Sequence, residues 1–199
     1  FGIYVRCNGT SKLNPLRNYY YFDSLDSGAL LTAESIDKQP RAAFLSPAQR
    51  RDPETRALNI HAISPYEWFA PWSETSYGKR PPDYEALKSR YAGVVLDFVE
   101  SHQSGFKSSI ERFATSTPVA NQHFNGSAEG SPYGIYHSME NTGARALGPN
   151  TRVRNLLITG QSSLFPGLLG AASSGLRTSG HIIGIKPALK ELRQLGGEA

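Results

Sequence analysis

The chain has 199 residues, which is enough for one substantial core or for one domain with a smaller attached piece. Its apolar fraction of 39% and charged fraction of 19% describe a globular chain and exclude a disordered one. The formal charge of +4 comes from scattered Lys and Arg residues. We therefore expect no nucleic-acid partner, because proteins that bind nucleic acid carry a clustered basic face.

The single cysteine, Cys7, cannot form an internal disulfide, and this favours a reducing compartment. No apolar run approaches the roughly 18 residues that a membrane span needs. We therefore predict a cytoplasmic location, with peripheral contact to a membrane left open. The chain starts at Phe1 within a strand-like run and not at Met, so we expect a fragment of a longer protein.

The first half of the sequence predicts β-strands at 3–6, 18–23, 41–46 and 57–64. The last two flank the turn signal Arg50-Arg51-Asp52-Pro53 and are expected to pair as a hairpin. Leu58, Ile60 and Ala62 alternate along the fourth strand, so they should share one face.

An aromatic cluster follows the fourth strand. Its members are Tyr66, Trp68, Phe69 and Trp72. The cluster could form a short helix or loop that packs onto the sheet, or it could line a pocket, because aromatic rings dominate cores as readily as sites.

The clearest predicted helix begins after Pro81-Pro82, with Asp83 as its N-cap, and ends by Gly105. Its apolar residues recur at helical spacing and predict a core-facing side. They are Tyr84, Leu87, Tyr91, Val94, Val95, Phe98 and Val99. Residues 110–153 contain many Gly and Pro residues and are predicted to be irregular, which is uncommon in a compact domain unless the segment is functional.

Order returns in the tail. Residues 156–159 form a short apolar run that predicts a buried strand, and Gly160 closes it. A long helix is predicted after Pro166-Gly167, and a last helix is predicted to start at Pro187.

The strand, the turn at Gly160 and the start of the long helix suit a flavin. A glycine lets the backbone approach a ribityl or phosphate group, and a helix N-terminus carries partial positive charge. Aimed at the pyrimidine edge of a flavin, this charge would stabilise the negative charge that grows there on reduction. The alternative is plain packing, since small residues also permit close contact between a helix and a sheet.

This segment resembles the C-terminal signature of the phytoene desaturase, carotenoid isomerase and retinol saturase flavoproteins. That signature is an apolar strand ending in Gly or Gly-Gln, followed by Pro-Gly and a Gly-Ala helix start. Three upstream motifs are similar to the same family and appear in its order. They are Asp52-Pro53, Thr117-Pro118 and Gly130-Ser131-Pro132-Tyr133-Gly134-Ile135. The resemblance covers most of residues 41–183.

The resemblance implies an α+β fold in two parts. Residues 1–150 would be a substrate-binding domain with a mixed β-sheet and packed helices. Residues 151–199 would be the C-terminal strand–helix part of a Rossmann-like FAD-binding domain whose N-terminal part is absent. No Gly-x-Gly-x-x-Gly motif occurs in the chain, so the adenine and pyrophosphate half of the FAD site is missing. The fragment alone should therefore bind FAD poorly and be inactive.

The resemblance also assigns site residues. Those expected near FAD are Gly160 and Gln161, at the ribityl chain, and Gly167, Leu168, Leu169 and Gly170, at the isoalloxazine ring. Those expected near an apolar substrate are Tyr66, Trp68, Phe69, Trp72 and Tyr133. No catalytic residue is assigned, and the five histidines show no metal-ligand spacing. His123 and His137 could face the flavin, although a surface or hydrogen-bonded role is the more ordinary one.

The predicted function is that of a C-terminal fragment of an FAD-dependent oxidoreductase of the desaturase, saturase or isomerase type, acting on an apolar isoprenoid or carotenoid-like substrate. The alternative is a non-catalytic module that binds an apolar ligand or partner through the aromatic cluster. Surface exposed by truncation would favour a homodimer.

Overall fold

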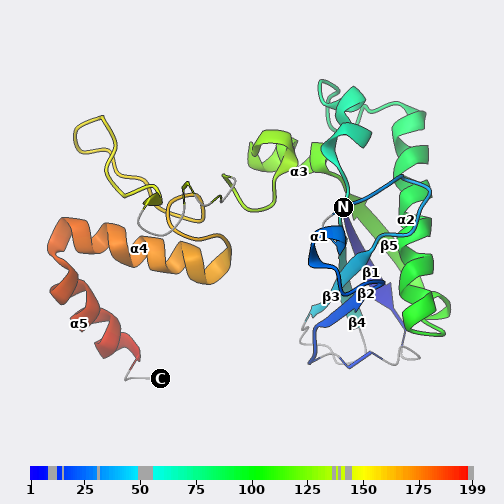
Figure 1. Cartoon of the computed structure of the whole chain (residues 1–199), viewed down its shortest axis with the longest axis horizontal. Coiled ribbons are helices and arrows are strands. Elements are labelled where there is room, and N and C mark those ends of the chain that lie inside the picture. The colour runs from blue at the N-terminus through cyan, green and yellow to red at the C-terminus, as the bar shows by residue number, and fades with distance from the viewer. Residues whose placement is uncertain are drawn as a thin grey trace. The chain divides into compact units, whose positions relative to one another are not determined.

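The computed structural model describes residues 1–8, 13–14, 16–30, 32–48, 56–135, 138, 140–141 and 145–196. The chain divides into two compact units, Phe1–Gly130 and Ser131–Ala199 (Figure 1). The boundary between these units precedes residue 150. The assignment of substrate binding to 1–150 and of FAD binding to 151–199 stays a prediction.

The first unit contains one five-stranded sheet. Its strands are β1 (Gly2–Cys7), β2 (Tyr19–Phe22), β3 (Ala42–Ala48), β4 (Arg56–Ala62) and β5 (Ile110–Ser116), in the order β2-β3-β4-β1-β5. Short helix α1 (Ser27–Leu30) lies between β2 and β3 in the sequence. The α+β class is confirmed.

Every strand pair in this sheet is antiparallel, so the predicted mixed sheet is wrong. The reason is the place of β1. Strands β4 and β5 run in the same direction and are connected through the long helix α2 (Pro82–His102), as parallel neighbours would be. Strand β1 lies between them and opposes both.

The predicted hairpin of β3 and β4 is confirmed by their register, in which Phe44 lies opposite His61 and Leu45 lies opposite Ile60. The turn signal Arg50-Arg51-Asp52-Pro53 lies outside the described residues. Leu58, Ile60 and Ala62 are all buried on one face, as their alternation predicts.

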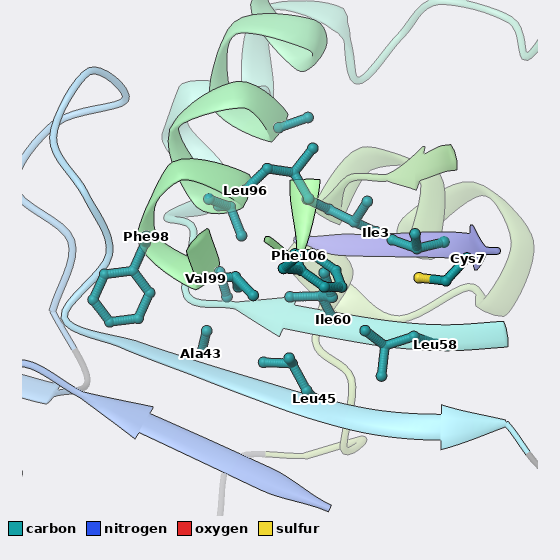
Figure 2. Close-up of a cluster of buried hydrophobic side chains, with 14 of the residues drawn as sticks. Ile3, Cys7, Ala43, Leu45, Leu58, Ile60, Leu96, Phe98, Val99 and Phe106 are labelled. Carbon is teal, nitrogen blue, oxygen red and sulfur yellow. The ribbon is translucent and has the colours of Figure 1, made fainter. Parts of the chain in front are cut away.

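Helix α2 covers that face of the sheet (Figure 1). Strand residues Ile3 and Ile60 and helix residues Val95 and Val99 are fully buried in one hydrophobic cluster. Figure 2 shows side chains of both layers meeting there. Burial of each such side chain contributes about 1.5–3 kcal/mol, so the packing of α2 on the sheet stabilises the first unit.

The predicted core side of α2 is largely confirmed, with Leu87 and Val94 only partly buried and Ala92 and Leu96 buried in addition. The predicted N-cap is wrong. Pro81 occupies that position, and Asp83 lies in the first turn, where its Oδ1 accepts from the backbone N of Tyr84 at 2.8 Å.

The predicted irregularity of 110–153 is wrong for its first part, which forms strand β5 and helix α3 (Pro118–Asn125). The short 3-10 helix η3 (Lys107–Ser109) precedes β5, and another, η4 (Ala128–Gly130), follows α3. Strand β5 is mostly exposed and lacks a buried–exposed alternation, so period two is invisible in its sequence. Helix α3 has a regular start and end. Thr117 Oγ1 accepts from Ala120 N at 3.2 Å, and Gly126 ends the helix with φ of 64°.

The second unit is built on two helices, α4 (Gly167–Ile183) and α5 (Ile185–Gly196), preceded by irregular backbone. The predicted strand at 156–159 is wrong, because the only pairing there among the described residues is an isolated bridge between Asn150 and Leu157. A strand needs a neighbour for its ladder. Helix α5 starts before Pro187, since the first turn tolerates proline.

Among the described residues, no helix combines the length and the apolar character needed to cross a bilayer.

Candidate functional site

The aromatic cluster forms two short 3-10 helices, η1 (Tyr66–Trp68) and η2 (Ala70–Trp72). Phe69 is fully buried against Tyr84 and Val119, and the Trp68 ring meets Tyr91 of α2 edge-on at 5.2 Å. The packing interpretation therefore describes most of the cluster. Contact of Tyr66, Trp68, Phe69 or Trp72 with a substrate stays a prediction.

A second group of rings lies on the face of the sheet away from α2, and sequence reasoning missed it. We call it the open face. Its members are Tyr4, Tyr20, Phe22, Phe44 and His61, which alternate with the buried or partly buried residues of their strands. Tyr20, Phe22 and Tyr4 are each about half exposed.

The rings of the open face form a row across neighbouring strands. The ring centroids of Tyr20 and Phe44 are 4.7 Å apart, and those of Phe44 and His61 are 6.0 Å apart. Tyr4 and His61 meet above Gly2, which has no side chain to separate them. An added Cβ on Gly2 would lie 3.3 Å from Tyr4 Oη and 3.8 Å from His61 Nδ1. Partial burial, and secondarily the nearby N-terminal amine, lower the pKa of His61. Such a contiguous apolar patch is typical of a binding surface.

In the second unit, hydroxyl groups of α4 hold the segment that ends at Gly160. Gly160 N donates to Ser174 Oγ at 3.0 Å, and Thr178 Oγ1 donates to the Ile158 carbonyl at 3.2 Å. Ser174 is buried. Gly160 has φ of 104°, a conformation that favours glycine. The predicted bend at Gly160 is therefore present, although side chains of α4 and not a strand ladder support it.

The structure brings two of the family-like motifs together. Gly134, with φ of 73°, lies so near the turn after Gly160 that an added Cβ would be 2.2 Å from Ser162 Oγ. Ser131 Oγ donates to the Gly134 carbonyl at 3.0 Å and closes this loop. Residues 131–135 and 160–163 thus form one local structure. Tyr133 in the loop is more than half exposed.

The start of α4 is open. Pro166 is its N-cap residue and provides no side-chain cap hydrogen bond. Leu168 and Leu169 are 92% and 80% exposed. An added Cβ at Gly160 or at Gly167 would meet no described heavy atom within 4 Å. Unlike these residues, Gly170 is buried, and an added Cβ there would lie 2.0 Å from the Phe165 carbonyl oxygen. Gly170 is explained by close packing, and Gln161 is partly buried.

The structure gives one of the two predicted histidines an ordinary ring contact, and their placement near a flavin stays a prediction. His123 stacks on Tyr77 with ring centroids 5.7 Å apart, and His137 lies outside the described residues. Within the described part of the chain, no three His, Cys, Asp or Glu side chains come together as metal ligands would.

The fold defines an α+β protein with two candidate surfaces. In the first unit an antiparallel sheet presents aromatic rings, and in the second unit a glycine turn lies beside the open start of a helix. Among known proteins, the chain is similar to retinol saturases, which confirms the resemblance predicted from its motifs. It is 28% identical over 199 residues to the all-trans-retinol 13,14-reductase of Danio rerio, and 26% identical over 199 residues to that of Rattus norvegicus.

In both comparisons the similarity covers 91% of this chain and 33% of the relative, so the chain spans about a third of these relatives' length. A protein of Danio rerio named inactive all-trans-retinol 13,14-reductase is 26% identical over 141 residues, covering 69% of this chain and 22% of that protein. No family model matches the chain. No solved structure matches it either.

Proposed function

We propose that this chain is part of an FAD-dependent oxidoreductase that acts on a retinoid or a related apolar isoprenoid. The observation that carries the proposal is the local structure formed by residues 131–135, the turn at Gly160 and the open start of α4. Its motifs resemble those of flavoproteins, and the relatives named all-trans-retinol 13,14-reductase are similar over 91% of the chain.

The residues present fit one edge of a flavin. Open space beside Gly160 and Gly167 leaves room for a flat group close to the backbone. The uncapped N-terminus of the 17-residue helix α4 would favour negative charge on that group. The exposed Leu168 and Leu169 would cover an apolar ring surface. When bound, FAD would supply the hydride chemistry. The Rossmann-like character of the surrounding domain belongs to this proposal as well.

The open face of the sheet fits the substrate. A row of rings from Tyr20 to Tyr4 offers a flat apolar surface, and the lowered pKa of His61 favours its neutral form there. Such a surface suits a conjugated hydrocarbon, which gains contact area and loses no hydrogen bonds on binding. The role of this chain would be to orient the substrate and to exclude water from it.

Anaerobic spectroscopy tests the function. The purified full-length flavoprotein, of which this chain would be one part, is reduced and mixed with all-trans-retinol. Two electrons and two protons would add across one carbon–carbon double bond, so oxidised flavin absorbance should return in step with the saturated product. Unchanged absorbance with retinol and with related polyenes would contradict the proposal.

A matched pair of variants tests the role of the open face. Tyr20 and Tyr77 are both 60% exposed, but only Tyr20 belongs to the row of rings. Tyr20→Ser should raise KM about tenfold, which corresponds to ~1.4 kcal/mol of lost binding. Tyr77→Ser should leave KM unchanged. Equal effects of the two variants would remove the open face from the proposal.

The second candidate function is a binding module without redox activity, which the similarity to a relative named inactive favours. Trp68 and Trp72 are the two tryptophans of the chain, so their fluorescence reports on the first unit. Quenching by a retinoid in protein that holds no flavin, even with FAD supplied, would support the binding module over the oxidoreductase.

A further inference from the structure

The sheet of the first unit has edges of very different length. Strand β2 (Tyr19–Phe22) is a four-residue edge, whereas β5 (Ile110–Ser116) is a seven-residue edge. Strand β1 pairs with one side of β5, and no described strand pairs with the other. Proteins protect sheet edges with short strands, proline or a covering loop, because an unpaired edge is a template for another strand. Shortness protects β2, but residues 113–116 of β5 carry neither proline nor charge.

The hydrogen bonds of β1 alternate between its two neighbours. Phe1, just before β1, exchanges two backbone hydrogen bonds with Ala62 of β4, at 2.9 and 3.0 Å. Backbone groups of successive residues in an antiparallel sheet point to opposite sides, so Tyr4, three residues further on, bonds toward β5. Tyr4 faces Ala114 in the register of β1 with β5. Ala114 therefore directs its N–H and C=O groups to β1.

Phe113 and Thr115, which flank Ala114, consequently direct their N–H and C=O groups away from β1. No hydrogen bond from another described residue reaches these four groups. The two residues are about 7 Å apart along the strand, which is the spacing at which an adjacent strand forms its next pair of bonds. Because buried backbone groups need partners, a segment that covers this edge must itself be extended and must bond to it. The edge therefore selects a β-strand.

The side chain of Phe113 occupies an unfinished core position at this edge. Phe113 faces Val5, which is buried on the α2 side of the sheet, and side chains of facing residues lie on the same side. Phe113 is nevertheless 46% exposed. A strand added beyond β5 would place a residue beside Phe113 at a distance of about 5 Å and would cover the outer side of its ring. We expect that residue to be apolar, since it would extend the packed layer.

We propose that β5 pairs with a further β-strand from the part of the full-length protein that lies outside this chain. The inference rests on the proposed function, because it takes the chain as one part of a protein as long as its relatives, of whose length the chain spans about a third. A strand on a short flexible tether has an effective concentration on the order of 1 mM. A second copy or a free peptide would have to reach that concentration to compete. The added strand would tie the first unit to the remainder of the protein.

Hydrogen exchange at single amides of the full-length protein tests the pairing. The amides of Arg112 and Ala114 point to β1, so they provide a control within the same strand. The amides of Phe113 and Thr115 should be protected as well, by about a hundredfold or more relative to an unstructured peptide. Fast exchange at Phe113 and Thr115, beside slow exchange at Arg112 and Ala114, would overturn the proposal.

The same measurement on this chain alone identifies the source of the strand. The Phe113 and Thr115 amides should then exchange at least about tenfold faster than in the full-length protein. Equal protection in this chain would overturn the proposal, and a rise of that protection with protein concentration would assign the edge to a second copy. The measurement needs no flavin. Slow exchange in a full-length protein that binds no FAD would therefore support this inference while contradicting the proposed function.

Two phenylalanines provide a matched pair of variants. Phe113 and Phe22 are 46% and 47% exposed and lie on opposite edge strands of the sheet. In the full-length protein, F113S should speed exchange at the Thr115 amide about tenfold relative to the Ala114 amide, because the added strand would lose the apolar ring that it covers. F22S should leave this ratio unchanged. Equal effects of the two variants, or no effect of F113S, would overturn the proposal.

Discussion

In the first unit, Ile3, Ile60 and Val95 are fully buried between the sheet and α2, whereas in the second unit Leu168 and Leu169 are 92% and 80% exposed. Large aliphatic residues thus form a core in the first unit and an exposed surface at the start of α4 in the second. The first unit buries most of its large aliphatic side chains in one core, although single residues such as Leu25 and Phe124 are exposed. In the second unit, hydroxyl groups of α4 bind the backbone of the preceding loop, and the large apolar side chains at the start of α4 are exposed. This difference indicates that the first unit supports itself, while the second depends more on what binds to it.

The largest expected effect separates the units by stability. Ile60→Ala should lower the free energy of unfolding by about 2–5 kcal/mol, because it opens a cavity in a packed core. Leu168→Ala should change it by less than about 0.5 kcal/mol, because the side chain is already in water. Urea denaturation followed by circular dichroism measures both. Similar costs for the two changes would break the comparison.

An intermediate effect concerns two glycines of α4. Gly170→Ala would place a Cβ against the Phe165 carbonyl, so it should cost about 1–3 kcal/mol through overpacking. Gly175 lies in the same helix, and its added Cβ meets no described heavy atom within 4 Å. Gly175→Ala should therefore stabilise the unit by up to about 1 kcal/mol through helix propensity. Thermal unfolding of both variants gives the sign, and a gain at Gly170 would contradict the packing described for it.

A smaller effect is expected at Ser174. Removing its hydroxyl with Ser174→Ala leaves Gly160 N without its acceptor, at a cost of about 1–2 kcal/mol. Exposed Ser179 in the same helix provides the control, and Ser179→Ala should be neutral. Hydrogen exchange at the Gly160 amide sharpens the test, since exchange should quicken in the Ser174 variant alone. Unchanged exchange would mean that other contacts hold the turn.

The spacing of apolar residues in the sequence predicted much of the fold of the first unit. Alternation identified β4 and its buried face, and helical spacing identified α2, because in both the buried residues are apolar and their neighbours are polar. Strand β5 escaped, since its exposed edge position leaves no alternation to detect. The run at 156–159 shows the converse error, because it has the apolar sequence of a strand without being one. It has no neighbouring strand in the described chain, and the Ile158 carbonyl accepts from Thr178 of α4.

The candidate site was predictable only where backbone conformation demanded glycine. Gly134, Gly160 and Gly167 all have positive φ, and their motifs identified the loops that contain them. The row of rings on the open face was hidden, because a strand such as Tyr19–Phe22 presents aromatics on both faces. Its register with β3 and β4 was needed to bring Tyr20, Phe44 and His61 together. Ser174 gave no signal, since a serine within a helix looks like a surface residue.

The flavin content of the purified full-length protein, of which this chain would be one part, is read from its visible absorbance and tests the central claim most directly. The account predicts bound FAD in the unaltered protein. Leu168→Asp should lower this content about tenfold, or by ~1.4 kcal/mol in binding, because it puts negative charge where the start of α4 would meet the cofactor. Leu25→Asp, at a similarly exposed leucine of the first unit, should retain FAD fully. A colourless protein that ignores added FAD, or equal flavin content in the two variants, would contradict the account.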